Sequence, residues 1–378
     1  MTDRNILIYA NKVTKPSETF IYFPAFAMQR YTPYYVGSLY GEGFDIPENR
    51  KFIANGGWRF GRIKQRVNRL LFGHNGVGHL TEKIRPINPL LIQAHFGTHA
   101  HNVLPLVHKL DIPFIVYYHG FDATMSRAYA ESKPHLRNYL QQLPRLHAES
   151  TLVLTQSNYL RERVIQDWGY PAEKVRTHYI GIEPSDEAPL PLSQREPMVL
   201  FVARLVEKKG ARYLLDAMKT VQERYPDVEL VMVGSGVLRE QLEAQADALK
   251  LNVRFLGWQV AHQVADLMKR ARIFCVPSVN AKSGDAEGFG MVFLEAQRAG
   301  TPVISTQHGG IVESVADGVV GTLVPEKQPA PLADAILDLL DDSAKWERYS
   351  QAGYERVQNE FSMQTLVAKL ETIYDTVI

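Results

Sequence analysis

The sequence predicts an α/β protein made of two Rossmann-like domains, each built on a parallel sheet. Short runs of Val, Ile, Leu, Phe and Tyr alternate with helix-length amphipathic stretches along almost the whole chain. The runs are continuously apolar, as expected of strands that are buried on both faces, and strands that alternate with helices form parallel sheets. There are too many such runs for one doubly wound sheet, and 378 residues is the length of about two or three ordinary domains.

The expected strands fall into two groups along the chain. In the first half they cover residues 5–10, 90–96, 113–119, 151–155 and 175–180. In the second half they cover residues 198–203, 228–233, 253–256, 273–277 and 302–306. Between these strands, residues 211–224 and 238–249 place apolar side chains at three- and four-residue steps, which predicts amphipathic helices.

A proline-rich stretch divides the chain at residues 184–197. Proline lacks a backbone N–H and restricts the residue before it, so we expect this stretch to be a linker. It separates an N-terminal domain, residues 1–183, from a C-terminal domain, residues 198–360. A break near Phe361 precedes a last helix, residues 361–378, which we expect to pack back onto the N-terminal domain. Because open parallel sheets bind ligands at the carboxyl ends of their strands, we expect a central cleft between the two domains to hold the ligand.

Composition narrows the class of protein. Hydrophobic residues make up 45% of the chain and charged residues 22%, which are globular values and exclude a disordered chain. The single cysteine, Cys275, excludes an intramolecular disulfide, and no apolar run reaches the roughly 18 residues of a membrane span. We therefore expect a soluble, cytoplasmic protein. Basic residues outnumber acidic ones by 22 to 14 in residues 1–185, and acidic residues outnumber basic ones by 27 to 20 in the rest, which indicates different partners for the two halves.

Two cations stand where an expected strand gives way to a helix. Arg204 directly follows the strand, and Lys209 comes five residues later, before Gly210 and the helix. Side chains at these places can converge on a diphosphate, helped by the N–H groups of the helix. Gly234 and Gly236 follow the next strand, where glycine lets the backbone approach a ligand closely. A solvated basic turn and an ordinary strand-to-helix turn are the alternatives.

The second cluster is the stretch GDAEGFGMVFLEAQRAG, residues 284–300. Glu287 precedes Gly288-Phe289-Gly290, and a helical pattern begins near Met291, with Glu295 in its first turns. The exposed N–H groups of such a turn suit a phosphate. Glu295 can accept hydrogen bonds from a ribose diol, and Glu287 from a sugar hydroxyl; a capping glutamate and a surface glutamate are the alternative interpretation.

Together with Leu256-Gly257-Trp258 and residues 299–304 and 308–313, these motifs resemble the retaining glycosyltransferases of family four, which have the GT-B fold. The resemblance implies that Arg204 and Lys209 bind the donor diphosphate, Glu287 the transferred sugar and Glu295 the ribose. The nucleotide-sugar-binding residues that it implies are Gly234, Gly236, Trp258, Gly288, Phe289, Gly290, Met291, Val292 and Glu295.

The first half matches through other motifs. Instead of a Gly-rich loop it carries Ser17-Glu18-Thr19-Phe20, which resembles the branch that makes exopolysaccharide and capsule repeat units, such as colanic acid or amylovoran transferases. The segment at residues 118–122 resembles the active-site histidine segment of the family, and Gln93-Ala94-His95 is another feature of the branch. The resemblance implies a catalytic contact from His119 to the donor sugar, although a histidine that ends a buried strand can be purely structural. The acceptor-side residues implied are Ser17, Thr19, His95 and Asp122.

The implied function is the transfer of a hexosyl group, with retention, from a nucleotide diphosphate sugar to a lipid-linked saccharide in exopolysaccharide or capsule synthesis. UDP is the favoured nucleotide. No metal ion is expected, because the paired cations make a divalent ion unnecessary. No cofactor and no nucleic acid partner are expected either. The alternatives are a GT-B nucleotide-sugar epimerase and a non-catalytic nucleotide-sugar-binding protein.

Residues 56–80 predict a contact with an anionic membrane surface. Five basic residues and no acidic ones occur there, interleaved with aromatic and aliphatic side chains at mainly three- and four-residue steps. A helix of this kind lies in the headgroup plane, and a core-packed helix with a basic outer face is the alternative. The resemblance decides between the two, because it implies lipid-linked sugar acceptors on the cytoplasmic leaflet, and we therefore expect peripheral attachment to the inner face of the plasma membrane. The basic residues are Arg59, Arg62, Lys64, Arg66 and Arg69.

Overall fold

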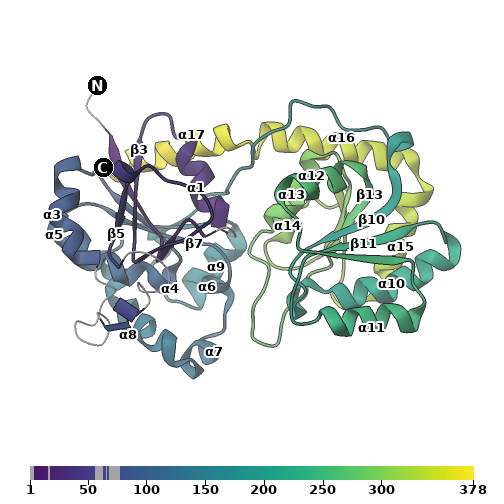
Figure 1. The fold of residues 1–378 in the computed structure, drawn as a ribbon, viewed down its shortest axis with the longest axis horizontal. Coiled ribbons are helices and arrows are strands. Elements are labelled where there is room, and N and C mark those ends of the chain that lie inside the picture. The colour runs from purple at the N-terminus through teal and green to yellow at the C-terminus, as the bar shows by residue number, and fades with distance from the viewer. Residues whose placement is uncertain (1–3, 16–17, 56–62, 65, 68–76) are drawn as a thin grey trace. The chain divides into compact units, whose positions relative to one another are not determined.

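The computed structural model describes residues 4–15, 18–55, 63–64, 66–67 and 77–378 (Figure 1). The chain divides into two compact units. The first contains Met1–Gly181 and Met363–Ile378, and the second contains Ile182–Ser362. Each unit has a parallel sheet with helices packed against it, which confirms the prediction of two parallel-sheet α/β domains.

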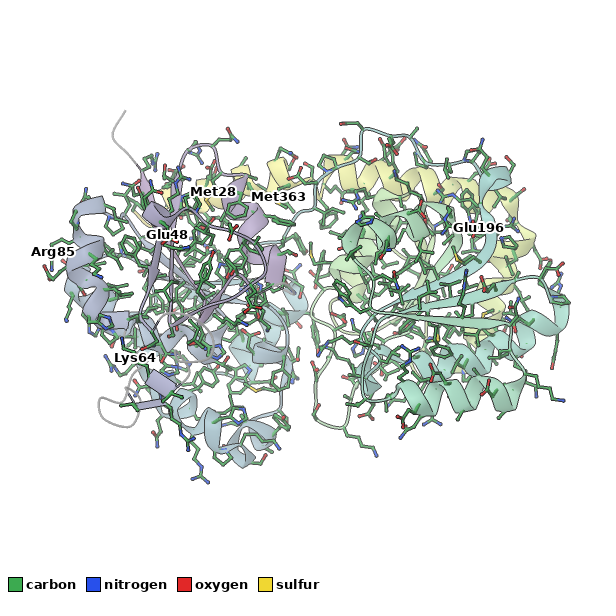
Figure 2. All side chains as sticks on the ribbon, in the orientation of Figure 1. Met28, Glu48, Lys64, Arg85, Glu196 and Met363 are labelled. Carbon is green, nitrogen blue, oxygen red and sulfur yellow. The ribbon has the colours of Figure 1, made fainter. Side chains whose placement is uncertain are left out.

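The sheet of the first unit has seven strands in the order β5-β3-β1-β6-β7-β8-β9, and every neighbouring pair is parallel. Every residue of β1, β6, β7 and β8 is buried, as the continuous apolar runs predict, and side chains fill the space around the sheet (Figure 2). The strands are β1 (Asn5–Tyr9), β3 (Thr32–Gly37), β5 (Lys51–Ile53), β6 (Ile92–His95), β7 (Phe114–Tyr118), β8 (Leu152–Thr155) and β9 (Val175–Thr177), beside the small pair β2 (Lys12–Val13) and β4 (Leu39–Tyr40).

Short helices connect these strands. Two of them begin at serine caps: Ser126 accepts a hydrogen bond from the backbone N–H of Tyr129, and Ser157 accepts one from that of Leu160. The helices are α1 (Thr19–Phe26), α3 (Thr81–Ile84), α4 (Gly97–Ala100), α5 (Leu104–Leu110), α6 (Phe121–Thr124), α7 (Arg127–Ser132), α8 (Arg137–Glu149) and α9 (Asn158–Gln166).

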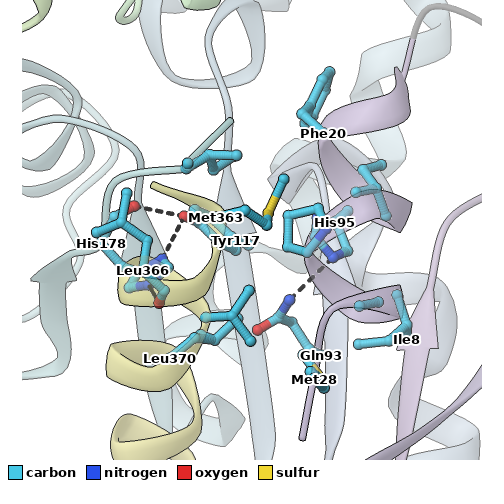
Figure 3. A pocket seen from close by; sticks show the side chains of 16 residues that line it. Ile8, Phe20, Met28, Gln93, His95, Tyr117, His178, Met363, Leu366 and Leu370 are labelled. Carbon is cyan, nitrogen blue, oxygen red and sulfur yellow. Dashed lines mark hydrogen bonds between the residues drawn. The ribbon is translucent and has the colours of Figure 1, made fainter. Parts of the chain in front are cut away.

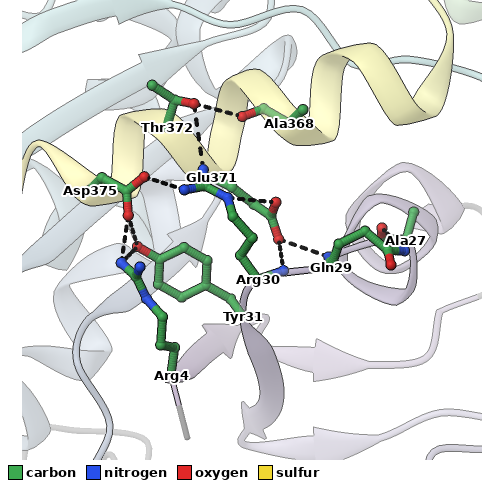
Figure 4. A network of polar contacts seen from close by, with 9 residues as sticks. All are labelled: Arg4, Ala27, Gln29, Arg30, Tyr31, Ala368, Glu371, Thr372 and Asp375. Atoms are coloured by element: carbon green, nitrogen blue, oxygen red, sulfur yellow. Dashed lines mark hydrogen bonds and ion pairs between the residues drawn. The ribbon is translucent and has the colours of Figure 1, made fainter. Parts of the chain in front are cut away.

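The last helix, α17 (Met363–Asp375), belongs to the first unit although it follows the whole second unit in sequence. Its buried carboxylate Glu371 accepts hydrogen bonds from the backbone N–H groups of Gln29, at 2.8 Å, and Arg30, at 2.7 Å (Figure 4). Asp375 accepts from the Tyr31 hydroxyl at 2.8 Å and pairs with Arg30. Charge-assisted bonds therefore fasten the chain terminus to the segment between α1 and β3.

The sheet of the second unit has six parallel strands in the order β12-β11-β10-β13-β14-β15. The strands are β10 (Glu196–Val202), β11 (Glu229–Val233), β12 (Val253–Gly257), β13 (Ala271–Cys275), β14 (Val303–Thr306) and β15 (Gly321–Val324). The helices are α10 (Ala211–Arg224), α11 (Arg239–Leu249), α12 (Ala261–Arg270), α13 (Met291–Arg298), α14 (Ile311–Ser314), α15 (Pro329–Asp341) and α16 (Ser343–Asn359).

The segment expected as a linker, residues 184–197, lies within the second unit. The buried guanidinium of Arg195 explains why, since it donates to Thr301 Oγ1 at 2.8 Å and to the carbonyl oxygen of Ala299 at 2.8 Å. Hydrogen bonds of a buried charge to fixed carbonyl groups hold this part of the segment against the domain.

Three strands of the two sheets were not expected from the sequence: β3, β5 and β15. The run TPYYVG of β3 contains Pro33, which normally argues against a strand inside a sheet. The register resolves this conflict, because Pro33 lies opposite Ile6 of β1 while β5 pairs only with Tyr35 and the two residues after it. The N–H that proline lacks is therefore not required for pairing with β5.

Candidate active site

The candidate residues of the second unit follow neighbouring strands at one edge of its sheet. Arg204 follows β10, Gly234 follows β11 and Trp258 follows β12. The turn after β11 packs directly on the segment after β10, since a Cβ atom at Gly234 would lie 1.9 Å from the carbonyl oxygen of Ala203. The side chains of Arg204 and Trp258 are exposed. The carboxyl ends of three neighbouring parallel strands thus place a cation (Arg204), a glycine turn without side chains (Gly234) and an aromatic ring (Trp258) at the same edge of the sheet.

Lys209 closes the short turn Glu207–Lys209 and forms an ion pair with Glu287. The neighbouring Lys208 pairs with Asp285, with Nζ and Oδ1 3.0 Å apart, so two adjacent lysines meet two carboxylates of the same loop. The structure therefore brings together Lys209 and Glu287, which are 78 residues apart in sequence. Burial opposes ionisation of Glu287, but the charges of Lys209 and Lys208 outweigh it and lower its pKa to about 2.

Backbone contacts hold Glu287 in place. Its N–H donates to Nε2 of His308 at 3.0 Å, and its carbonyl oxygen accepts from the N–H of Gly310 at 2.9 Å. Because Nε2 accepts, the neutral ring of His308 carries its proton on Nδ1, which donates to Glu326 at 2.6 Å. His308, Glu326 and the Lys208–Asp285 pair support the site and were not among the candidate site residues. His308 and Asp285 lie within the motifs at residues 308–313 and 284–300, but the sequence alone indicated no partner for either of them.

Helix α13 begins directly after the glycine turn, as the sequence predicts. Gly290 precedes it with φ of 84°, and a Cβ atom there would lie 2.5 Å from the Phe293 ring, so glycine is required. Gly288 and Phe289 precede Gly290, and Met291 and Val292 lie in the first turn of α13. Burial raises the pKa of Glu295, and its carboxylate makes no hydrogen bond within the part of the chain that the structure describes. This carboxylate can accept hydrogen bonds from a ligand.

The candidate residues of the first unit meet where β6 and β7 end. Asp122 is buried and accepts three backbone hydrogen bonds, from Gly97 at 2.9 Å, Gly120 at 2.9 Å and His119 at 3.1 Å. These bonds favour its charge, but burial outweighs them and raises its pKa to about 6. The carboxyl therefore fastens the loop after β7 to the loop after β6.

His95 and His119 are both buried, and Nδ1 of His95 lies 2.8 Å from Nε2 of His119. Burial lowers the pKa of His119 to about 3 and holds that of His95 well below its ordinary value, so both rings are neutral near pH 7. The ring of Phe20 lies 4.8 Å from that of His119, and together with His95 it lines a cavity that α1 and α17 enclose (Figure 3). Thr19, at the start of α1, is half-buried, and Ser17 lies outside the described residues.

Most of the expected membrane segment also lies outside the described residues. Arg59, Arg62 and Arg69 are among the residues left out, whereas Ile63 and Val67 are described and are 65% and 45% exposed. Among the described residues, no helix has the length and apolar character to cross a bilayer. The same residues contain no cluster of three or more His, Cys, Asp or Glu side chains placed to hold a metal ion.

Two family profiles match almost the whole chain. Residues 39–186 match the family described as Glycosyltransferase Family 4, and residues 183–356 match the one described as Glycosyl transferases group 1. The two parallel-sheet domains are those of the GT-B class of glycosyltransferase folds. The chain belongs to glycosyltransferase family four, which confirms the resemblance seen in its motifs.

Two relatives of the chain are named for exopolysaccharide synthesis. The amylovoran biosynthesis glycosyltransferase AmsK of Erwinia amylovora is 31% identical over 265 residues, which cover 69% of this chain and 63% of that protein. The putative colanic acid biosynthesis glycosyltransferase WcaL of Escherichia coli K12 is 28% identical over 261 residues, which cover 68% of this chain and 62% of that protein. The chain thus spans less than two thirds of the length of these relatives.

Solved structures share the fold. The structure of Anabaena Alr3699/HepE in complex with UDP-glucose has a TM-score of 0.76 and 20% sequence identity, and the match covers 98% of this chain and 99% of that one. At this identity the likeness concerns the fold alone.

Proposed function

We propose that the protein is a retaining glycosyltransferase that moves a hexosyl group from a UDP-sugar to a lipid-linked saccharide. The observation that carries the proposal is the arrangement around Glu287. Its carboxylate pairs with Lys209 and directly precedes the glycine turn of α13, whose Glu295 carboxylate makes no hydrogen bond within the described residues. Cations, backbone N–H groups and acceptor oxygens are the three kinds of group that a nucleotide diphosphate sugar requires.

The donor side of the reaction needs charge stabilisation on the leaving diphosphate. Arg204, Lys209 and the N–H groups at the start of α13 supply it as donors that are in place before the reaction. The ammonium group of Lys209 has three N–H donors and can hold Glu287 and a phosphate oxygen together. Glu287 orients the transferred sugar, and Glu295 accepts from the ribose hydroxyls.

Retention follows if the acceptor attacks the face that the diphosphate leaves, with a departing phosphate oxygen taking the acceptor proton. This route needs neither a covalent nucleophile nor a metal ion, in contrast to the two-carboxylate mechanism of retaining hydrolases. His119 contacts the donor sugar in this scheme. The preference for UDP is supported by the UDP-glucose complex of the Anabaena neighbour.

The proposed acceptor is supported by the exopolysaccharide relatives, and the proposed location by exposed side chains within residues 56–80. The relatives named for amylovoran and colanic acid synthesis support a saccharide acceptor in exopolysaccharide synthesis. The exposed apolar side chains of Ile63 and Val67, beside Lys64 and Arg66, support contact of residues 56–80 with anionic lipid. The protein would then work in the cytoplasm on the inner face of the plasma membrane.

The test is incubation of the full chain with UDP-, GDP- and ADP-sugars, with and without saccharide acceptors and EDTA. Sugar transfer or slow nucleotide release from UDP-sugars is the expected result, at a rate that EDTA leaves nearly unchanged. Formation of an epimer would favour an epimerase, and binding without release would favour a nucleotide-sugar-binding protein. A strict metal requirement would contradict the role given to Arg204 and Lys209.

A further inference from the structure

A chain of side-chain hydrogen bonds runs through the first unit from the loop after β8 to α17. Gln156 Oε1 lies 3.4 Å from Nδ1 of His119, and Nε2 of His119 lies 2.8 Å from Nδ1 of His95. Nε2 of His95 lies 3.0 Å from Nε2 of Gln93 (Figure 3). Oε1 of Gln93 accepts from the Tyr374 hydroxyl at 2.9 Å. All five side chains are buried.

The direction of this chain is fixed at its Gln156 end. The Gln156 amide nitrogen donates to the backbone carbonyl oxygen of His119, which can only accept. The other atom of the same amide, Oε1, therefore faces Nδ1 of His119. An acceptor there requires a proton on Nδ1, because two acceptors facing each other would leave both without a partner.

The remaining links follow in order. A neutral imidazole has one N–H, so Nε2 of His119 is an acceptor and Nδ1 of His95 must donate to it. Nε2 of His95 is then an acceptor and receives the Gln93 amide N–H. This orientation leaves Gln93 Oε1 facing Tyr374, where it accepts the hydroxyl proton. Each link of the chain joins a donor to an acceptor only in this one arrangement.

Stacking fixes the planes of the same rings. The rings of His95 and His119 are 5.0 Å apart and inclined by 9°, and Tyr117 stacks on His119 at 4.6 Å and 24°. Hydrogen bonds and stacking thus set both the proton position and the orientation of His119. The link to Gln156 is the longest in the chain and the one that a ligand can replace most easily.

We propose that His95, Gln93 and Tyr374 are positioning residues that hold His119 as its Nδ1–H tautomer, so that this ring offers a ligand a hydrogen-bond donor. The ligand atom that replaces Gln156 must then be an acceptor. This step rests on the proposed function, in which that atom is a sugar hydroxyl oxygen. The tautomer itself is a property of the free protein. Through Gln93 and His95, Tyr374 of α17 thereby fixes the tautomer of His119, which follows β7.

A third buried histidine provides an internal reference with the opposite tautomer. Nε2 of His178 lies 2.9 Å from the carbonyl oxygen of Leu366, which requires a proton on Nε2. Nδ1 of His178 lies 3.0 Å from the Tyr117 hydroxyl. Among these three buried histidines, two rings with Nδ1–H and one with Nε2–H are therefore expected.

The experiment is long-range proton–nitrogen NMR of the full chain with 15N-labelled histidine and without ligand, near pH 7. The spectrum of the wild type should show Nδ1–H forms for His95 and His119 and the Nε2–H form for His178. Gln93→Glu replaces the amide donor by a carboxylate acceptor of the same shape, so Nε2 of His95 should become protonated. Finding His119 in the Nε2–H form in the wild type would overturn the proposal, whether or not the Gln93→Glu variant folds.

Tyr374→Phe tests the positioning role directly, because a purely structural role of Tyr374 would not change the tautomer of His95. Tyr31→Phe is its control. Tyr31 also bonds to α17, through Asp375, and packs edge-on against Tyr374, but it forms no hydrogen bond with Gln93 among the described residues.

Tyr374→Phe removes the donor that keeps Gln93 in its orientation, so the long link to Gln156 has to oppose the other tautomer without that support. We therefore expect this variant to populate part of the other tautomer of His95 and to lower transfer about 10-fold, as loss of a supporting residue does at metal sites, while Tyr31→Phe changes neither. Wild-type NMR spectra and rates in Tyr374→Phe would contradict the proposal. If the tautomers are as expected but no variant or wild type transfers sugar, the proposed function fails and the positioning stands.

Discussion

Replacing Lys209 by methionine removes one charge of a buried pair and, in the proposed function, one contact to the donor diphosphate. The side chains of Lys209 and Glu287 are 12% and 13% exposed, so water cannot fully hydrate the carboxylate that is left behind. We therefore expect Lys209→Met to lower both thermal stability and transfer activity. Adding Glu287→Gln in the same chain removes the second charge. This should restore the thermal stability but not the transfer activity.

The size of the effect follows from the pKa of Glu287. Burial raises this pKa, yet Lys209 and Lys208 lower it from 4.5 to about 2, which corresponds to about 3 kcal/mol of favourable interaction with the ionised form. Lys208 keeps its share, so we expect the loss of Lys209 to cost about 2 kcal/mol. Because the folded pKa lies below the unfolded one, this stabilisation is present above about pH 4.5 and is lost as the pH falls through about 2.

The assay compares wild type, Lys209→Met, the double variant Lys209→Met/Glu287→Gln and Lys219→Met at pH 7. Lys219 is an exposed residue of α10 and serves as the matched control. Thermal unfolding should show a lower Tm for Lys209→Met, recovery of most of the difference in the double variant, and no change for Lys219→Met. The transfer rate should fall about 100-fold or more in both variants that lack Lys209, as for the loss of one transition-state donor.

Two results would refute this reasoning. An unchanged Tm in Lys209→Met would show that the pair does not contribute to stability. Wild-type transfer in the double variant would show that neither Lys209 nor Glu287 handles the donor, and the site would have to lie elsewhere.

Three further predictions concern other parts of the chain. Glu295→Ala should weaken nucleotide binding more than it lowers the turnover of bound donor, and unchanged affinity in calorimetry would remove its ribose role. Burial raises the pKa of Asp122 to about 6, so its contribution to stability is full below about pH 4 and is lost as the pH rises through about 6. The difference in Tm between wild type and Asp122→Asn should therefore shrink from about pH 4 to about pH 7, and a constant difference would contradict the assignment. Reversal of Arg62, Arg66 and Arg69 to Glu should reduce flotation with anionic liposomes, and equal flotation of wild type and variant would exclude attachment through residues 56–80.

The sequence predicts the fold well where local pattern and tertiary environment agree. Residues 211–224 were expected as a helix and form α10 with the same bounds, because their apolar stripe at helical spacing packs on the sheet. β3 was missed because Pro33 argues against a strand, and only the register with β5 shows that its missing N–H is harmless.

The candidate site divides in the same way. Arg204 and Gly234 could be placed together from the sequence, because each follows an expected strand of a parallel sheet, whereas Trp258 was named only through the family resemblance. The chain from Gln156 to Tyr374 could not, since Gln93 and Tyr374 are 281 residues apart and no periodicity links them. The pairing of Lys208 with Asp285 was hidden for the same reason: side-chain partners across a fold depend on packing that local patterns do not encode.

The most direct test of the proposed function is proton NMR of a reaction with a UDP-sugar and a saccharide acceptor, recorded during the first turnovers. The anomeric proton of the first product should show the same configuration as that of the donor, and the signal should grow in step with free UDP. A product of inverted configuration would contradict the mechanism built on Arg204, Lys209 and Glu287, and UDP-sugar that stays intact beside a correctly folded protein would contradict the function itself.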